Sequence, residues 1–192
     1  MEYTEIIFSV FLGIGLAAAV GFRVFLPLLV LSLSAFYDII PLNESWVWAG
    51  SLSAVIILAV ATIVEILGYY IPWFDNALDT IAIPLAAVAG TAVMMATLAD
   101  MDPVVTWALA IIAGGGTAAV VKGNTSALRL TSTATTGGLA NPVVATVETG
   151  TSTLMSLVSV FIAPLAFLFV VLIFFGIYKF YKKLKKKRPP SA

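Results

Sequence analysis

Cysteine and histidine are both absent from the 192 residues of this chain. Their absence excludes disulfides, thiol catalysis, haem ligation through histidine, zinc sites built on either residue, and catalytic triads with a histidine base. The sequence also shows no carboxylate pair typical of glycosidases and no signature of nucleic-acid binding. We therefore expect no metal, no cofactor, no nucleic-acid partner and no enzymatic activity.

Charge is scarce as well. Only 10% of the residues are charged, against about 25% in ordinary soluble domains. Hydrophobic residues make up 61% of the chain, and its mean hydropathy is +1.08. A soluble domain with a buried core would need a polar outer surface, and the residues for one are missing. The composition predicts an all-α, polytopic membrane helical bundle, and the length suits one domain of five or six spans.

The few basic residues are unevenly distributed. Seven of the ten lie in the last fourteen positions, at Lys179, Lys182, Lys183, Lys185, Lys186, Lys187 and Arg188. Under the positive-inside rule, this tail at 179–192 stays cytoplasmic. It serves either as a topology anchor alone or also as a site for anionic lipid headgroups. The opening residues lack the basic start of a signal peptide, so we expect the first apolar segment to be retained.

Long apolar segments fill a membrane domain at residues 1–178. The first, Ile6–Phe36, is interrupted only by Arg23. At about 1.5 Å per residue, a helix of that length exceeds a hydrocarbon core of about 30 Å. We therefore expect it to tilt steeply or to break between Gly21 and Pro27. The later segments are 46–64, 80–98, 104–121 and 154–178.

The stretch from Lys122 to Thr153 differs from its apolar flanks. Twelve serine or threonine residues lie between Asn124 and Thr153, and the stretch is broken at Gly137-Gly138 and at Asn141-Pro142. Lipid cannot satisfy a broken polar backbone, so such a segment at membrane depth must be buried in protein or line a watery cavity. We interpret this stretch as the functional core, built from broken or re-entrant helices.

A faint internal repeat is visible. Residues 13–20 read GIGLAAAV and residues 114–121 read GGGTAAVV, and a basic residue follows each run. One interpretation is an inverted repeat of three membrane elements in each half, 1–100 and 101–178, with both termini cytoplasmic. The other is chance recurrence of small residues that pack helices closely. The stretch from Lys122 to Thr153 would then re-enter the membrane, and five spans would place the amino terminus outside.

Six ionisable residues lie inside or at the edges of apolar segments. Each costs roughly 2.5–3.5 kcal/mol at mid-membrane, which makes unpaired burial unfavourable. Three are basic and three acidic, so complete pairing is available. They form either structural ion pairs between helices or the lining of a substrate or proton path; they are Arg23, Glu65, Asp79, Lys122, Arg129 and Glu148.

Helical spacing places several of these residues on shared faces. Lys122, Ser126, Arg129, Thr133 and Thr136 step by three or four residues, and Asn141, Glu148 and Ser152 share a face of the next segment. Two polar stripes would then face each other across the glycine pair. Lys122, Arg129 and the positive end of a broken helix could hold an anion. Glu148 could complete an ion pair, or it could carry a proton. For Asp79, at the start of a span, favourable placement at a positive helix end is the simpler interpretation.

The chain resembles the bacterial membrane family called domain of unknown function forty-one twenty-six. The similar features run in order from Gly21 to Glu148. They are Gly21-Phe22-Arg23-Val24-Phe25-Leu26-Pro27-Leu28-Leu29, Val64-Glu65, Ile71-Pro72, Asp75, Asp79, Pro84, Gly90, Gly114 to Gly116, Arg129, Asn141-Pro142 and Glu148. Members often carry an acidic pair where this chain has Glu148-Thr149. The resemblance implies a small multi-span protein of the bacterial inner membrane and brings no established activity.

Three functions are compatible with these features. The first is a small transporter or channel-like permease in which Arg23, Lys122 and Arg129 meet an anionic solute or a lipid phosphate. Its remaining path residues are Glu65, Asp79, Thr133, Asn141 and Glu148, and its helix breaks lie at Pro27, Gly137, Gly138 and Pro142. The second is a non-transporting structural or assembly subunit of a membrane complex. The third, an intramembrane enzyme using Lys122, lacks a base–nucleophile motif. The expected partners are the lipid bilayer and a second copy of the chain in a homo-oligomer.

Overall fold

The computed structural model describes the backbone of residues 3–186, and the side chains in that range except those of 72–74, 76–77 and 184–186. Within it the chain is helical and contains no strand, so the predicted all-α class is confirmed. The elements are α1 (Tyr3–Phe22), α2 (Phe25–Phe36), η1 (Glu44–Gly50), α3 (Leu52–Gly68), α4 (Pro72–Thr97), α5 (Pro103–Leu109), η2 (Ala110–Gly115), α6 (Gly116–Thr136), α7 (Asn141–Phe161) and α8 (Ala163–Lys186).

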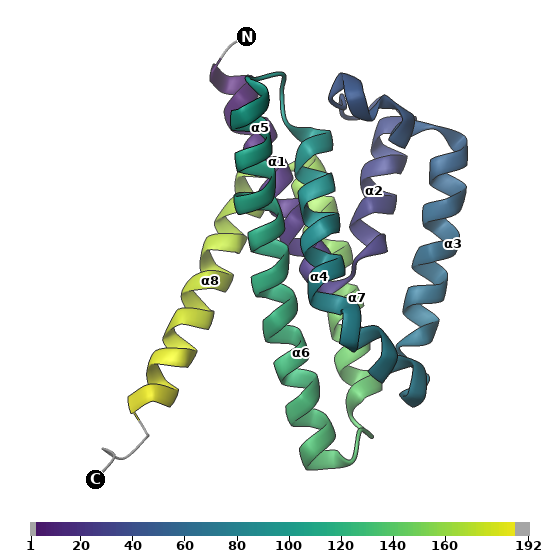
Figure 1. Cartoon of the computed structure of the whole chain (residues 1–192), viewed down its shortest axis with the longest axis vertical. Coiled ribbons are helices and arrows are strands. Elements are labelled where there is room, and N and C mark those ends of the chain that lie inside the picture. The colour runs from purple at the N-terminus through teal and green to yellow at the C-terminus, as the bar shows by residue number, and fades with distance from the viewer. Residues whose placement is uncertain (1–2, 187–192) are drawn as a thin grey trace.

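The described part of the chain is a polytopic helical bundle. Five segments are long and apolar enough to cross a membrane, and the bent pair of η1 and α3 adds a sixth. This confirms the prediction of five or six spans. Successive helices run up and down between two ends of the molecule (Figure 1). The amino terminus lies at one end, called here the N-terminal end, and the carboxyl terminus lies at the other, called the tail end.

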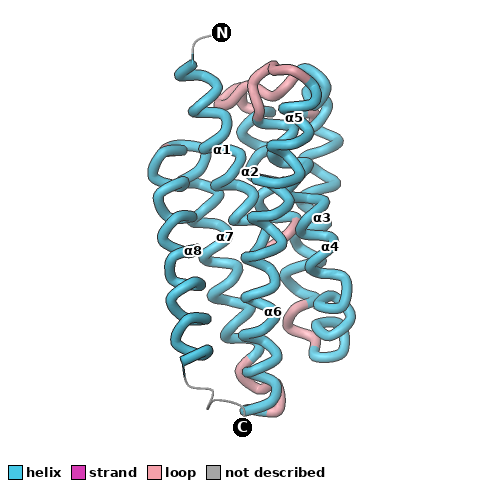
Figure 2. The backbone as a smooth tube through the Cα atoms, turned by 60° about the vertical axis from the view of Figure 1, so that its left-hand side comes forward, coloured by secondary structure: helices cyan, strands magenta, loops and turns pink. Residues whose placement is uncertain are grey.

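The first apolar segment is broken, as its length required. α1 ends at Phe22 and α2 begins at Phe25, so the break falls at Arg23 and Val24. Pro27 is the third residue of α2. A proline in the first turn removes only an N–H group that has no partner within the helix, and its fixed φ favours the turn. Figure 2 shows this short link part-way along the bundle, whereas the longer loops lie towards its two ends.

The polar stretch forms a helical hairpin. α6 runs without interruption to Thr136, and α7 begins at Asn141. Gly137 and Gly138 have φ angles of 63° and 88°, in the left-handed region that glycine adopts at low cost at helix ends. Pro142 occupies the first turn of α7. The break expected within this stretch is therefore a four-residue turn at the tail end (Figure 1).

Close helix contacts surround α1. Its residues Leu16, Ala17, Ala18, Ala19 and Val20 are fully buried, and α4, α6, α7 and α8 pack against it. Glycines also bring α4 against the π-helical turn η2. A Cβ added at Gly114 would lie 2.6 Å from the Gly90 carbonyl oxygen. Small residues at such interfaces let helix backbones approach closely, which is a main source of packing energy in membranes.

The inverted repeat is not confirmed. Residues 13–20 lie in α1, and residues 114–121 lie in η2 and α6. Figure 1 shows both segments running from the N-terminal end towards the tail end, whereas an inverted repeat would set them in opposite directions. The basic tail expected at 179–192 continues α8 as far as Lys186. Lys187 and Arg188 lie outside the described residues.

Two neighbouring glycines test the close packing of α4 against η2. In Gly114→Ala the new Cβ would lie 2.6 Å from Gly90 O and from Met94 Cβ, so the helices must separate. We expect this variant to lose about 1–3 kcal/mol of unfolding free energy, as in other overpacked interiors. The control is Gly116→Ala, where an added Cβ meets nothing within 4 Å, and which should gain up to about 1 kcal/mol from helix propensity. Unfolding experiments in detergent micelles measure the free energy of unfolding of both variants. Equal values for the two would contradict the close packing at Gly114.

Candidate functional site

A buried cluster of charged side chains lies where five segments of the bundle meet. It contains three basic and four acidic residues arranged around one tyrosine. Its members come from the α1–α2 link, the end of α3, the first turn of α4 and the turn that follows it, and the facing sides of α6 and α7. They are Arg23, Glu65, Tyr69, Asp75, Asp79, Lys122, Arg129 and Glu148, called here the ionic cluster. Lys122, Arg129 and Glu148 lie within segments long enough to span a membrane.

Arg129 is the most fully paired member. Its Nε donates to Glu148 Oε1 at 3.1 Å, and its Nη2 contacts Glu148 Oε2, which makes a bidentate pair between α6 and α7. Its Nη1 lies 2.5 Å from Asp75 Oδ1, in the first turn of α4. Asn141 Nδ2 donates to the other oxygen of Asp75 at 3.1 Å and also to Thr133 Oγ1. One guanidinium therefore joins three helices, with the planar donor geometry that suits carboxylates.

Tyr69 separates the basic groups. The Cζ atoms of Arg23 and Arg129 lie 4.0 and 4.2 Å from the centre of its ring. Two guanidinium groups at those distances cannot share one face, so the ring lies between them. Cations are attracted to an aromatic face, more so when water is excluded. The Tyr69 hydroxyl also accepts from Lys122 Nζ at 3.2 Å. Tyr69 thus holds three like charges at fixed positions.

Arg23 joins the α1–α2 link to α7. Its Nε donates to Thr149 Oγ1 at 3.0 Å, and its Nη2 donates to the Ala145 carbonyl oxygen at 2.8 Å. Nη2 also lies 3.8 Å from Glu148 Oε2. Its Nη1 has no hydrogen-bond partner among the described residues, although the side chain is fully buried.

Glu65 stabilises the break between α1 and α2. Its two carboxylate oxygens accept from the backbone N–H groups of Val24 at 2.8 Å and of Phe25 at 2.9 Å. The first N–H groups of a helix have no partner within it, and a carboxylate there also favours the positive end of the helix dipole. Glu65 from α3 therefore closes the start of α2 with a side chain distant in sequence.

The cluster is incompletely paired. Lys122 is 0% exposed, yet within the described part of the chain its ammonium bonds only to the Tyr69 hydroxyl. Asp79 interacts electrostatically with Arg129 and Lys122, but its Oδ1 is buried without a hydrogen-bond partner. Asn141 Oδ1 is also buried and without a partner. Donors and acceptors of this kind are costly to bury, so they are where the cluster can bind something else.

A small cavity reaches the ionic cluster from the tail end. Its volume is about 220 Å³, and Tyr69, Asp75 and Asn141 line it together with Thr133 and the Gly137–Gly138 turn. The hydroxyls of the polar stretch contribute less to this cavity than their number suggests. Thr131, Thr135 and Thr151 donate to carbonyl oxygens one turn earlier in their own helices. Such bonds are common in helix packing. The same three threonines also line a separate cavity of about 480 Å³, which Glu148 borders.

Comparison with known protein families identifies the family of this chain. A family model described as a domain of unknown function, DUF4126, matches residues 10–183. The chain belongs to the DUF4126 family. No match was found among the curated proteins or the solved structures. In this DUF4126 chain, Thr149 stands where the resemblance implied a second carboxylate, and its hydroxyl accepts from Arg23.

All the residues singled out for a substrate or ion path lie in or beside the ionic cluster of this DUF4126 chain. Arg23, Glu65, Lys122, Arg129 and Glu148 belong to it, as does Asp79, whereas Thr133 and Asn141 line its cavity. The breaks at Gly137, Gly138 and Pro142 border the same cavity, whereas Pro27 lies in α2. Within the described residues no group of three or more His, Cys, Asp and Glu could hold a metal ion.

Sequence reasoning missed two members of the cluster. Tyr69 and Asp75 lie between the apolar segments 46–64 and 80–98, where the path residues expected from the sequence were Glu65 and Asp79. Tyr69 is 3% exposed, and Asp75 is also 3% exposed, so both are core residues of the site. The three-to-three count of basic and acidic residues gave no reason to look for a fourth carboxylate. The one available signal was the position of Asp75 in the family resemblance.

The cap that Glu65 provides can be tested by its removal. Glu65→Ala leaves the N–H groups of Val24 and Phe25 without an acceptor, which costs about 1–3 kcal/mol for each buried group. Glu65→Gln keeps one acceptor and should lose less. Unfolding free energies in micelles measure the series. The control, Glu44→Ala, removes an exposed carboxylate and should change stability by no more than about 0.5 kcal/mol. A Glu65→Ala variant as stable as this control would contradict the capping role.

Proposed function

We propose that this protein is a small membrane permease whose translocation site is the ionic cluster. The observation that carries the proposal is the incomplete pairing of charged groups whose polar atoms are buried in the cluster. Lys122 has one neutral partner, and Arg23 Nη1 and Asp79 Oδ1 have none among the described residues. A cluster that only held helices together would lose stability through each unsatisfied group, because buried ion pairs repay desolvation only when their remaining bonds are made.

The incompletely bonded donors of the cluster favour an anionic solute or a lipid phosphate. These donors belong to two cations: Arg23, which lies over the ring of Tyr69, and Lys122, which donates to its hydroxyl. An anionic group bound there would complete their hydrogen bonds with strong, charge-assisted ones. Asp79, which interacts electrostatically with Lys122, is the proposed proton carrier. Glu65 and Glu148 are the counter-charges that keep the empty site stable.

The route into the site is proposed to begin at the tail end. The cavity of about 220 Å³ lies there, and so does the basic end of α8. Seven of the ten basic residues follow Tyr178, so the positive-inside rule favours a cytoplasmic position for this end in the inner membrane of a bacterium. Clustered positive charge also raises the local concentration of anions, which would steer an anionic solute to this opening.

Lys122 provides the sharpest test of the permease. Lys122→Met keeps an unbranched apolar side chain in the same buried place but removes the charge. We expect this variant to lower anion flux by at least about tenfold, since the solute would lose a charge-assisted contact. The measurement uses purified protein in liposomes, with phosphate, chloride and acetate as separate probe anions. Pyranine inside the liposomes reports accompanying proton movement.

The control for this experiment is Lys179→Met, which removes one of the seven basic residues at and beyond the exposed end of α8 and leaves six to attract anions. It should leave flux within about twofold of the unaltered protein. The proposal fails if the unaltered protein shows no flux above empty liposomes for any of the three anions. It also fails if Lys122→Met transports as well as Lys179→Met. Elution as a single folded species from size exclusion establishes that each variant is intact.

A second candidate is a non-transporting assembly subunit. It is favoured by α8, because only 17% of its apolar span, within Ala163–Lys183, is buried inside the chain. The exposed remainder is a broad face for a partner helix or a second copy. The full pairing of Arg129 with Asp75 and Glu148 also suits a purely structural cluster. Absence of wild-type flux for all three anions, together with a stable complex formed through α8, would support this function instead.

A further inference from the structure

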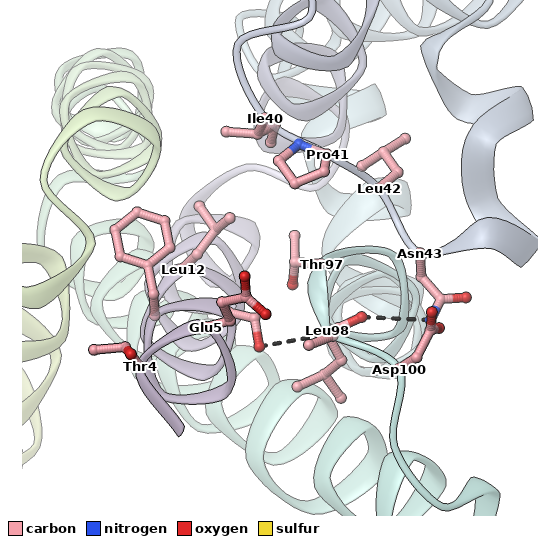
Figure 3. Close-up of a pocket in the computed structure, with 13 residues that line it drawn as sticks. Thr4, Glu5, Leu12, Ile40, Pro41, Leu42, Asn43, Thr97, Leu98 and Asp100 are labelled. Atoms are coloured by element: carbon pink, nitrogen blue, oxygen red, sulfur yellow. Dashed lines mark hydrogen bonds between the residues drawn. The ribbon is translucent and has the colours of Figure 1, made fainter. Parts of the chain in front are cut away.

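A second and larger cavity opens at the N-terminal end. Its volume is about 650 Å³, and it lies between the first half of α1, the loop at 40–43, and residues 97–100 at and after the end of α4 (Figure 3). This volume falls within the roughly 300–1,000 Å³ of typical small-molecule sites. None of the ionic-cluster residues lines it. The cavity is therefore a separate feature that the proposed permease site does not explain.

The walls of this cavity are held in place by hydrogen bonds between its three segments. Ser9 Oγ in α1 accepts from the Ala99 N–H at 3.2 Å. The Asn43 N–H donates to the Ala96 carbonyl oxygen at 2.9 Å, and Asn43 Nδ2 donates to Asp100 Oδ1 at 2.9 Å. Figure 3 shows the side chains of Asn43 and Asp100 next to each other beside the opening. A cavity whose walls are tied in this way needs little ordering when a ligand binds.

The lining has two chemical parts. Most of it is apolar, from Phe8, Leu12, Ile40, Pro41, Leu42 and Leu98. The two ionisable side chains in the lining, Glu5 and Asp100, are both carboxylates, and both are exposed. Among the described residues no ion pair reaches either of them. An apolar chamber with unpaired negative charge suits a ligand with an alkyl body and a positive head.

The surrounding charge has the same sign. Every lysine and arginine of the chain lies either in the ionic cluster or from Lys179 onward. The described charged side chains at the N-terminal end are all acidic. They are Glu5, Asp38, Glu44, Asp100 and Asp102. A surface of one sign raises the local concentration of the opposite charge, and low-dielectric walls strengthen that effect. The end therefore attracts cations and repels anions.

We propose that this cavity binds an amphiphilic organic cation, an alkyl chain with an ammonium head. The alkyl chain lies against Phe8, Leu12 and Leu98, and the ammonium group lies at Glu5 and Asp100. Burial of the chain supplies the affinity, and the carboxylates supply the selection for positive charge. The site is independent of the proposed permease function, because it shares no residue with the ionic cluster.

The first experiment measures binding of radiolabelled dodecyltrimethylammonium to the full chain in phosphatidylcholine nanodiscs, with empty nanodiscs as background. We expect saturable binding with one site per chain. Dodecanoate, which has a similar chain and the opposite charge, should compete only at concentrations at least about tenfold higher. Binding no greater than that of empty nanodiscs, or equal competition by dodecanoate, would overturn the proposal.

The second experiment changes the charge of the cavity alone. In Glu5→Gln/Asp100→Asn, residue 100 can still accept from Asn43, so the wall is preserved. We expect this variant to bind dodecyltrimethylammonium at least about tenfold more weakly. The matched control, Asp38→Asn/Glu44→Gln, removes two negative charges from the same end outside the cavity, and asparagine tolerates the positive φ of residue 38. Equal losses in the two variants would overturn the proposal.

A third measurement needs no altered residue. A dodecylammonium probe with a diazirine in its chain should label the unaltered protein at residues 4–12, 40–43 and 97–100. Labelling confined to other segments would overturn the proposal even if the variants failed to fold. The two proposals can fail separately. Labelling of this cavity without any anion flux would contradict only the permease, and anion flux without labelling of this cavity would contradict only the cation site.

Discussion

The ion pairs of Arg129 are the constraint on which the arrangement of this bundle depends. One guanidinium, 1% exposed, joins Asp75 at the start of α4 to Glu148 in α7 while belonging to α6. Breaking a buried pair of this kind costs about 3–5 kcal/mol, because the remaining charge is left buried without a partner and without hydration. The α3–α4 link must therefore fold back against the α6–α7 hairpin, and this brings Tyr69 between Arg23 and Arg129.

The rest of the molecule is organised around that cluster along one axis. Towards the N-terminal end, small residues pack α1 closely against its neighbours, and the described charges are acidic. Towards the tail end, the cluster opens into a small cavity beside the α6–α7 turn and the basic end of α8. The described part of the bundle therefore carries opposite charge at its two ends, with incompletely paired charged groups between them.

The membrane class, the spans and the break after α1 could be predicted because they depend on local properties: hydropathy, length and the glycine and proline positions. The pairing of α6 with α7 also followed from helical spacing, which placed Arg129 and Glu148 on facing sides. Tyr69 and Asp75 could not be predicted, since their roles arise from a link folding back on helices more than fifty residues away. The cap of α2 by Glu65 is likewise a tertiary contact with no local signal.

A pair of double-mutant cycles tests the central claim most directly. Arg129→Met is combined with Asp75→Asn and, separately, with Glu148→Gln, and unfolding free energies are measured in micelles. The ionic cluster predicts that both pairs deviate from additivity by about 0.5–3 kcal/mol, whereas Arg129→Met with the distant Asp38→Asn adds within about 0.5 kcal/mol. Additive losses in all three cycles would contradict an Arg129 that joins α4, α6 and α7.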